Sequence, residues 1–419
     1  MKLFQQMLVA SAAIGLIAPI GAQANDINIE GMNSYSSSKS SSKKQQFNSK
    51  TFANELATVN EKIDGLETQF NEFEAGSFSD TTVLDGKAVF DVGSVDTDDD
   101  AYTGETQFMY TYTMNLNTSF TGDDNLYTRI KTGNHSSWSK TKSVYNTYLS
   151  SGNGNGDELK VDKLWYTTPV GENHTITFGP KIENYYMHAT TPSIYEPVLK
   201  AFTLGGNASA YGASTSPGAG WAYAADNGFA VSSNVTTQKG NTSTGILTNQ
   251  GKTSWATQVG YTKPTYSVSA LVNMKYNGWT DSYFMSTDGK ARAGDGNSTN
   301  IGLRGWWRPS NSDTAMPSVS VGFDTSETDA STNSNTTAYF VGLNWTDVIN
   351  ADDKIGIAFG QPQKAEGETI DPFLYEVYYK YSVNDSVTVT PTIFGGTSKN
   401  SSDVETDMTG YLVQTTFKF

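Results

Sequence analysis

Residues that could catalyse a reaction or bind a metal are few among the 419 residues of this chain, and their spacing fits neither task. The three histidines, His135, His174 and His188, show no metal-ligand spacing. The sequence contains no G-x-S-x-G, P-loop or H-E-x-x-H motif. The acidic run 96–100 lacks the glycine and distal glutamate of an EF-hand loop, so we expect a solvated external loop there. The sequence therefore predicts no enzyme, no cofactor and no metal site.

Charged side chains that alternate with apolar ones suggest a different chemistry, the selection of solutes by charge. In segments where every second residue is apolar, the intervening positions include Arg129, Lys131, Lys275, Arg304, Glu376 and Lys380. Each of these charges would cost about 2–4 kcal/mol on the lipid face of a membrane strand. We therefore expect polar faces turned inward and these six side chains lining a water-filled pore. A wide hole without selectivity, lined by the same charges, is the alternative.

The long polar connection 182–217 carries further side chains that could act on solutes. They are Glu183, Tyr185, His188, Tyr195, Glu196 and Lys200. A connection of this length is uncommon without structure of its own, so we expect it to fold into the pore and narrow it. Its carboxylates would then face basic residues of the wall, and the resulting field would filter solutes by size and charge. Its tyrosines would offer flat surfaces to sugar rings.

The elements that must position these residues are strands, because the hydropathy has a period of two from residue 80 onward. In 106–120, for example, Phe108, Tyr110 and Tyr112 alternate with polar residues. The expected strands are 82–93, 106–120, 125–132, 159–168, 174–181, 218–226, 228–236, 252–262, 265–277, 298–308, 317–325, 336–346, 354–361, 372–382, 386–396 and 408–419. Their connections alternate between short and long, as in a transmembrane barrel with tight periplasmic turns. The prediction is an all-β transmembrane barrel of about 16 antiparallel strands over residues 80–419.

The last strand ends on aromatic residues that alternate with polar ones. Tyr411, Phe417 and Phe419 form the pattern that we expect the barrel-assembly machinery of an outer membrane to recognise. An even number of strands also places both ends of the barrel on the periplasmic side.

Composition excludes several other classes of protein. The chain has no cysteine, which rules out a disulfide scaffold, a thiolate nucleophile and a Cys-ligated zinc site. Its 28 basic and 43 acidic residues give a formal charge of −15, which argues against nucleic acid as a partner. No apolar run is long enough for a transmembrane helix.

The first 50 residues indicate export. Lys2, the apolar stretch 7–20 and Ala22-Gln23-Ala24 have the pattern of a signal peptide over residues 1–24; a membrane anchor is the alternative. Residues 25–50 are rich in serine and lysine, so we expect a flexible tether there. Its basic cluster could contact an anionic surface, although a solvated linker is the simpler interpretation.

Residues 51–76 show the seam of a coiled coil. Apolar residues recur at spacings of four and three at Phe52, Leu56, Val59, Ile63, Leu66, Phe70 and Phe73. Such a narrow stripe must pack against another copy or a neighbouring domain. Aromatic and β-branched seam residues favour a homotrimer; a helix lying on its own barrel is the alternative.

Several blocks resemble cyanobacterial outer-membrane porins of the carbohydrate-selective OprB type. They are FANELATVNEKIDGLETQF through EAGSFSDTTVLDGKAVF (52–90), LGGNASAYG (204–212), YEVYYKYSVNDSVTVTPTIF (375–394) and YLVQTTFKF (411–419). The resemblance implies a passive, trimeric channel for sugars or inorganic ions in the outer-membrane lipid, with its coiled coil in the periplasm. Unlike most cyanobacterial members, this sequence has only the tether where a wall-binding S-layer-homology domain would stand. A structural or adhesive envelope protein that uses the barrel as an anchor is the main alternative, and an outer-membrane lipase is a distant third.

Overall fold

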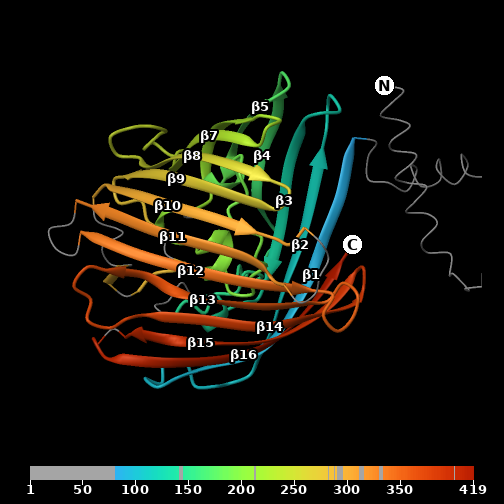
Figure 1. Ribbon diagram of the computed structural model, residues 1–419. Coiled ribbons are helices and arrows are strands. Elements are labelled where there is room, and N and C mark those ends of the chain that lie inside the picture. The colour runs from blue at the N-terminus through green and yellow to red at the C-terminus, as the bar shows by residue number, and fades with distance from the viewer. Residues whose placement is uncertain are drawn as a thin grey trace, which may run out of the picture. The chain divides into compact units, whose positions relative to one another are not determined.

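Sixteen antiparallel strands form a closed barrel in the described part of the computed structural model (Figure 1). They are β1 (Thr82–Thr97), β2 (Gln107–Thr118), β3 (Asn125–Gly133), β4 (Lys160–Val170), β5 (His174–Ile182), β6 (Ser216–Ala224), β7 (Phe229–Gln238), β8 (Lys252–Lys263), β9 (Tyr266–Tyr276), β10 (Ser298–Trp307), β11 (Ser318–Thr328), β12 (Asn335–Thr346), β13 (Lys354–Ala365), β14 (Phe373–Asn384), β15 (Val387–Lys399) and β16 (Glu405–Lys418). Four 3-10 helices lie in the connections: η1 (Ser137–Ser139), η2 (Asn184–Met187), η3 (Lys200–Gly205) and η4 (Ser209–Tyr211). The predicted barrel and its strand number are confirmed.

The structure describes residues 81–140, 145–211, 214–281, 283–286, 288–289, 296–310, 316–329, 334–400 and 402–419. All of them belong to the unit Gly76–Phe419. The expected signal peptide, tether and coiled coil, with its seam from Phe52 to Phe73, lie outside the described residues. No helix within the described residues is long and apolar enough to cross a bilayer.

The barrel closes between its first and last strands. β1 pairs with β2 on one side and with β16 on the other, in a register that sets Lys87 opposite Lys418. The final residue completes this seam, because the Gly86 N–H donates to the Phe419 carbonyl (2.8 Å) and the Phe419 N–H donates to the Gly86 carbonyl (3.1 Å). The Phe419 ring stacks on Tyr112 at 5.6 Å. The C-terminal aromatic residue is thus part of the wall.

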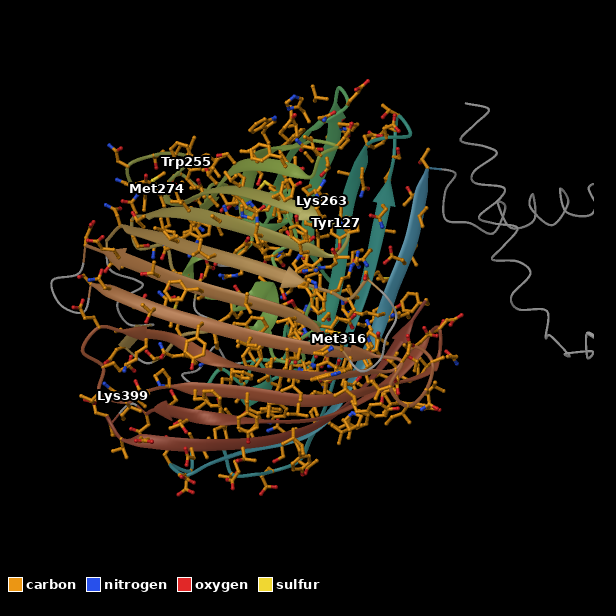
Figure 2. All side chains as sticks on the ribbon, in the orientation of Figure 1. Tyr127, Trp255, Lys263, Met274, Met316 and Lys399 are labelled. Carbon is orange, nitrogen blue, oxygen red and sulfur yellow. The ribbon has the colours of Figure 1, made fainter. Side chains whose placement is uncertain are left out.

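The outer face of the barrel carries the apolar half of each alternating strand. Phe108, Val268 and Ile393 expose 69%, 56% and 59% of their surface, as a lipid-facing belt requires. Figure 2 shows Trp255 and Met274 toward the end where the long loops lie, and Lys263 and Met316 toward the end of the short turns. Several strands are longer than their apolar stretch predicts, β16 for instance beginning at Glu405 instead of 408. The additional residue pairs of these strands lie beyond the apolar belt, where apolar and polar side chains no longer need to alternate.

The inner face is polar on one side of the barrel and apolar on the other. The inward positions of β7 to β9 are mostly polar, such as Ser232, Asn234 and Asn273, although Leu271 of β9 packs in a small apolar cluster with Tyr211. Those of β12 to β16 include Phe340 and Phe394, which are buried in a hydrophobic core. The expectation of a polar inward face is therefore wrong for this side, because connections fold inside the barrel and cover it.

Candidate pore constriction

The connection between β5 and β6, residues 183–215, is the inner loop of this barrel. Its η2 contacts β6 to β8, its η3 contacts β11 and β12, and its η4 contacts β9 to β11, so it follows the inner wall (Figure 1). Phe202 and Leu199 of the inner loop pack in one core with Phe340 and Phe394 of the wall. The apolar residues hidden in this polar loop therefore bind it to the β12–β16 side of the barrel.

Glu376 of β14 holds the inner loop through three hydrogen bonds. Its carboxylate accepts the backbone N–H groups of Leu199 (2.7 Å) and Val198 (3.2 Å) and the hydroxyl of Tyr195 (2.9 Å). Glu376 is fully buried and Tyr195 nearly so. Glu376 points inward as predicted but does not line the pore, because the inner loop covers it.

Arg304 of β10 fastens the next part of the inner loop. Its guanidinium donates to the carbonyls of Leu204 (2.8 Å) and Gly206 (2.9 Å), and it pairs with Asp324 at 2.8 Å. The same group lies over the Tyr211 ring. Arg304 is only 4% exposed, so the prediction that it lines the pore is also wrong.

Lys275 of β9 is the third predicted pore residue that the inner loop covers. It donates to the Ser209 carbonyl and lies 3.4 Å from the Asp281 carboxylate. Lys275 is 2% exposed. Strand alternation correctly predicts that the side chains of Glu376, Arg304 and Lys275 point inward. A buried charge needs hydrogen-bond donors or acceptors around it, and the polar backbone of the inner loop supplies them.

Two other connections fold inward and hold the tip of the inner loop. The connection 134–159 forms two backbone hydrogen bonds with the inner loop. The Lys200 N–H donates to the Tyr148 carbonyl, and the Ser150 N–H donates to the Val198 carbonyl, both at 2.7 Å. The Asp91 carboxylate of β1 accepts the Ser151 hydroxyl at 2.9 Å and so fixes this connection to the wall. From the β9–β10 connection, Tyr283 stacks on Tyr148 at 5.6 Å.

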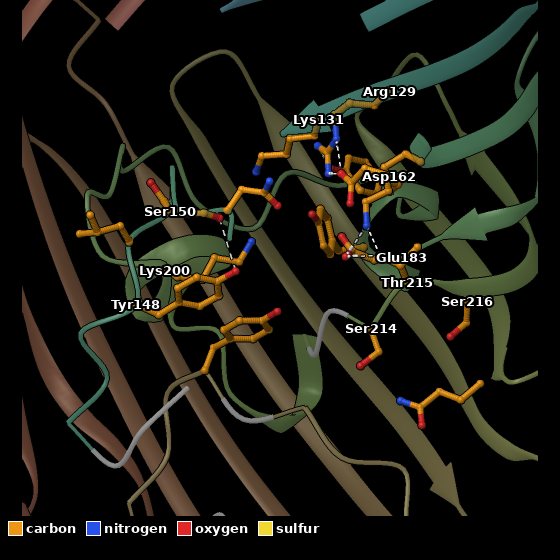
Figure 3. Close-up of a pocket in the computed structure, with 18 of the residues that line it drawn as sticks. Arg129, Lys131, Tyr148, Ser150, Asp162, Glu183, Lys200, Ser214, Thr215 and Ser216 are labelled. Atoms are coloured by element: carbon orange, nitrogen blue, oxygen red, sulfur yellow. Dashed lines mark hydrogen bonds and ion pairs between the residues drawn. The ribbon is translucent and has the colours of Figure 1, made fainter. Parts of the chain in front are cut away.

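A cavity of about 720 Å³ remains open between the β3–β4 wall and the inner loop (Figure 3). Arg129, Lys131, Asp162 and Lys163 line it from the wall; Glu183, Tyr185, Tyr186 and Lys200 from the inner loop; Tyr148 and Tyr283 from the other two connections. The cavity therefore brings together residues from both predicted groups. Arg129 and Lys131 come from the group expected to line the wall, and Glu183, Tyr185 and Lys200 from the group expected on the loop.

Two ion pairs lie in the lining of the cavity. Arg129 Nε donates to Asp162 at 2.6 Å, and Lys163 Nζ lies 2.5 Å from the Glu183 carboxylate. Burial alone would raise the pKa of Glu183, but the nearby ammonium groups of Lys163 and Lys200 lower it to about 2. Glu183 is therefore ionised at neutral pH.

Basic side chains outnumber acidic ones around the cavity. Among its described lining residues are five cations and two carboxylates, an excess of three positive charges. Lys131 and Lys200 extend into the cavity from the wall and from the loop (Figure 3). The Lys200 ammonium lies over the rings of Tyr185 (6.0 Å) and Tyr283 (5.5 Å).

Aromatic rings form a continuous series beside these charges. Tyr127 contacts Trp165 at 4.4 Å between ring centroids, Trp165 contacts Tyr186 at 4.7 Å, and Tyr186 contacts Tyr185 at 4.3 Å. The series passes from β3 and β4 onto the inner loop. It presents flat apolar surfaces next to hydrogen-bonding groups.

The remaining predicted residues lie elsewhere on the inner loop or the wall. Glu196 pairs with Lys354 and, at 2.9 Å, with Lys380, and both ammonium groups hold its pKa below the ordinary value although burial opposes this. His188 contacts the Ser232 hydroxyl at 3.2 Å, and burial lowers its pKa to about 3, so it is neutral at physiological pH.

Several residues of the cavity are not among those that the sequence predicted. Asp162 reaches it through a register shift between β3 and β4, which alternation does not predict. Tyr148 and Tyr283 come from connections without periodicity. Lys163 could have been found, because it alternates with Leu164 in the expected strand 159–168.

A closed sixteen-strand barrel narrowed by an inward-folded third loop is the architecture of a porin. Two solved structures share the fold. Pseudomonas putida OprB at high pH has a TM-score of 0.58 and 11% identity, with 81% of this chain and 94% of that chain covered. A triple mutant of Rhodopseudomonas blastica porin has a TM-score of 0.52 and 11% identity, with 81% and 100% covered.

Residues 38–397 match the OprB family of carbohydrate-selective porins, and the chain belongs to this family. The alr4550 protein of Nostoc sp. is 24% identical over 416 residues, which cover 88% of this chain and 70% of that protein. The sll0772 protein of Synechocystis sp. is 31% identical over 131 residues, or 30% of this chain and 24% of that protein. The chain is thus an outer-membrane porin, a channel for the passive diffusion of small hydrophilic solutes.

Proposed function

We propose that sugars and inorganic ions cross this porin through the cavity between the β3–β4 wall and the inner loop. The observation that carries the proposal is the lining of that cavity, where ion pairs and the rings of four tyrosines, Tyr148, Tyr185, Tyr186 and Tyr283, surround one open volume of about 720 Å³. A sugar presents an apolar ring face and polar hydroxyl edges, which fit aromatic surfaces next to charged groups. Of the residues predicted to line the pore, Arg129 and Lys131 line this cavity, whereas Lys380 lies outside it and pairs with Glu196.

Conductance in planar lipid bilayers tests this function. The purified full chain should produce stable ohmic current steps, and proteoliposomes should swell in isosmotic glucose but not in isosmotic dextran. An electrically silent barrel would refute the channel and favour the alternative of a structural or adhesive envelope protein.

We also propose that the porin is a homotrimer whose coiled coil stands in the periplasm. The support is the heptad seam of residues 51–76 and the even number of strands, which brings both barrel ends to one side. Native mass spectrometry of the detergent-solubilised full chain should give three copies, and Ile63→Asp should reduce this to one. A monomer for the unaltered chain would contradict the trimer, whereas a trimer for Ile63→Asp would contradict the seam.

A further inference from the structure

The charge inside this porin is opposite to the charge of the whole chain. The chain carries a formal charge of −15, yet the lining of the cavity at the inner loop has three more cations than carboxylates. A second opening of about 660 Å³ adjoins it on the loop side. Lys131, Lys160, Lys181 and Lys239 line this opening together with Asp162, and Lys160 also pairs with Glu158. The positive potential therefore begins before the narrow part of the pore is reached.

The charges on the turn side of the cavity are mixed. Lys87 of β1 shares the inward face with Asp91 and is solvent-exposed. Lys418 of β16 stands opposite it in the register of the two strands. Lys380 pairs with Glu196, however, and the opening at the turn end is lined by three lysines and four aspartates, so the excess of cations belongs to the cavity and its loop side.

The pairing of these groups singles out Lys131. Arg129 is neutralised by Asp162 and Lys163 by Glu183. Lys131 forms no ion pair within the described residues, and it extends into the cavity next to Lys200 (Figure 3). Tyr148 and Tyr186 line the same volume, and the Tyr186 hydroxyl lies 3.3 Å from the Arg129 guanidinium.

This donor set fits one class of small solute. An inorganic oxyanion has several acceptor oxygens, so ammonium, guanidinium and hydroxyl groups can all donate to it at once. A divalent oxyanion also gains twice the Coulomb energy of a monovalent ion, while a cation is repelled. A neutral sugar does not respond to the excess charge, so the aromatic rings alone do not account for the lysine that lacks a carboxylate partner.

We propose that the cavity at Lys131 is a binding site for small inorganic oxyanions and that it makes the porin anion-selective. The inference rests on the proposed function, since a solute must reach the cavity through an open channel. The lysines of the adjoining opening concentrate anions at the loop-side mouth of the site and let them leave by exchange between neighbouring positions.

The first experiment measures ion preference in planar bilayers with the full chain under a KCl gradient. The dilute side should become negative, because chloride permeates faster than potassium. Lys131→Gln should lower the permeability ratio about fourfold, the factor that one unit charge about 5 Å away provides in water. Lys263→Gln removes the same charge at the turn end, where the side chain lies over the Tyr261 ring, and should leave the ratio unchanged. A positive dilute side, or equal ratios for both variants, would overturn the proposal.

The second experiment tests binding with two oxyanions at constant ionic strength. Sodium sulfate and sodium phosphate at pH 7 should each reduce the chloride current in a saturable manner. Lys131→Gln should raise the half-blocking concentration about sixteenfold for a divalent anion, because twice the charge squares the fourfold factor. Block by both salts supports a site for divalent oxyanions in general, and block by phosphate alone supports a site that requires a donor on the ligand. Unblocked current with either salt would overturn the site although the channel conducts, whereas a missing current would mean that the proposed function itself has failed.

Discussion

At the scale of single residues, the state of Glu183 is set by competition between burial and nearby charge. Removing a carboxylate from water favours its neutral form, but Lys163 at 2.5 Å and the neighbouring Lys200 favour the ion. The ammonium of Lys163 is itself buried, so each partner depends on the other. A buried pair of this kind is costly to break from one side.

We expect Glu183→Gln to destabilise the barrel by about 3–5 kcal/mol, because it leaves the Lys163 ammonium buried without a counter-charge. Urea unfolding in lipid vesicles, followed by tryptophan fluorescence, measures the change. The double variant Lys163→Gln/Glu183→Gln is the control and should recover much of the loss. Equal stability of the single variant and the unaltered chain would show that the pair is not coupled.

Acid should weaken the same contact within a defined range of pH. The pKa of Glu183 is lowered from 4.5 to about 2 in the folded protein, so its stabilising contribution is present above pH 4.5. That contribution is lost as the pH falls through 4.5 toward 2, because the unfolded chain then binds the proton more readily. Unfolding temperatures between pH 7 and 2 should decline in this window, and the Glu183→Gln variant should decline less there.

At the scale of elements, the inner loop is held by buried polar groups of strands and not by its own structure. Its helices η2, η3 and η4 have three to six residues each and do not persist alone. Glu376, Arg304 and Lys275 each accept or donate to loop backbone. These three charged residues, which were predicted to line the pore, therefore anchor the inner loop, and the inner loop narrows the pore.

We expect Glu376→Leu to release the inner loop. The substitution leaves the Leu199 and Val198 N–H groups and the Tyr195 hydroxyl without their acceptor, at about 1–3 kcal/mol for each buried donor. Single-channel recordings should show larger and noisier current steps, and a protease should cut within 183–215. The matched control is Tyr195→Phe, which removes one of the three bonds and should have a much smaller effect. Unchanged current steps for Glu376→Leu would show that the loop does not depend on this anchor.

At the scale of the whole molecule, the seam between β1 and β16 turns a curved sheet into a channel. Closure removes the two edges that an open sheet would present to lipid, where unpaired backbone groups cannot be hydrated. Phe419 takes part in this closure through its backbone bonds to Gly86 and its stacking on Tyr112. We also expect the barrel-assembly machinery to recognise the terminal phenylalanine during insertion into the membrane.

Phe419→Ser should therefore lower the amount of folded barrel in the outer membrane. Heat-modifiable mobility on gels of isolated membranes measures this amount. Refolding of the same variant into detergent micelles should be much less affected, because the backbone bonds to Gly86 do not need the ring. Normal insertion of the variant would contradict an assembly role for the terminal residue.

The sequence alone determined the strands, their outward faces and the alternation of long and short connections. Side-chain alternation is a local property, because each residue turns its side chain opposite to its neighbours whatever the rest of the chain does. For this reason the pattern of apolar residues suffices to assign Phe108, Val268 and Ile393 to the lipid face. The inward direction of Arg129, Arg304 and Glu376 was predictable for the same reason.

Only the tertiary structure decided which inward charges meet a solute. Arg129 and Arg304 have the same residue type and the same alternating pattern, yet one lines the cavity and the other is buried beneath the inner loop. The difference depends on the path of residues 183–215, which is set by contacts with distant strands, such as the bond from Leu199 to Glu376 across 177 residues. Those contacts have no local period, because packing and buried hydrogen bonds between distant segments hold the loop in place.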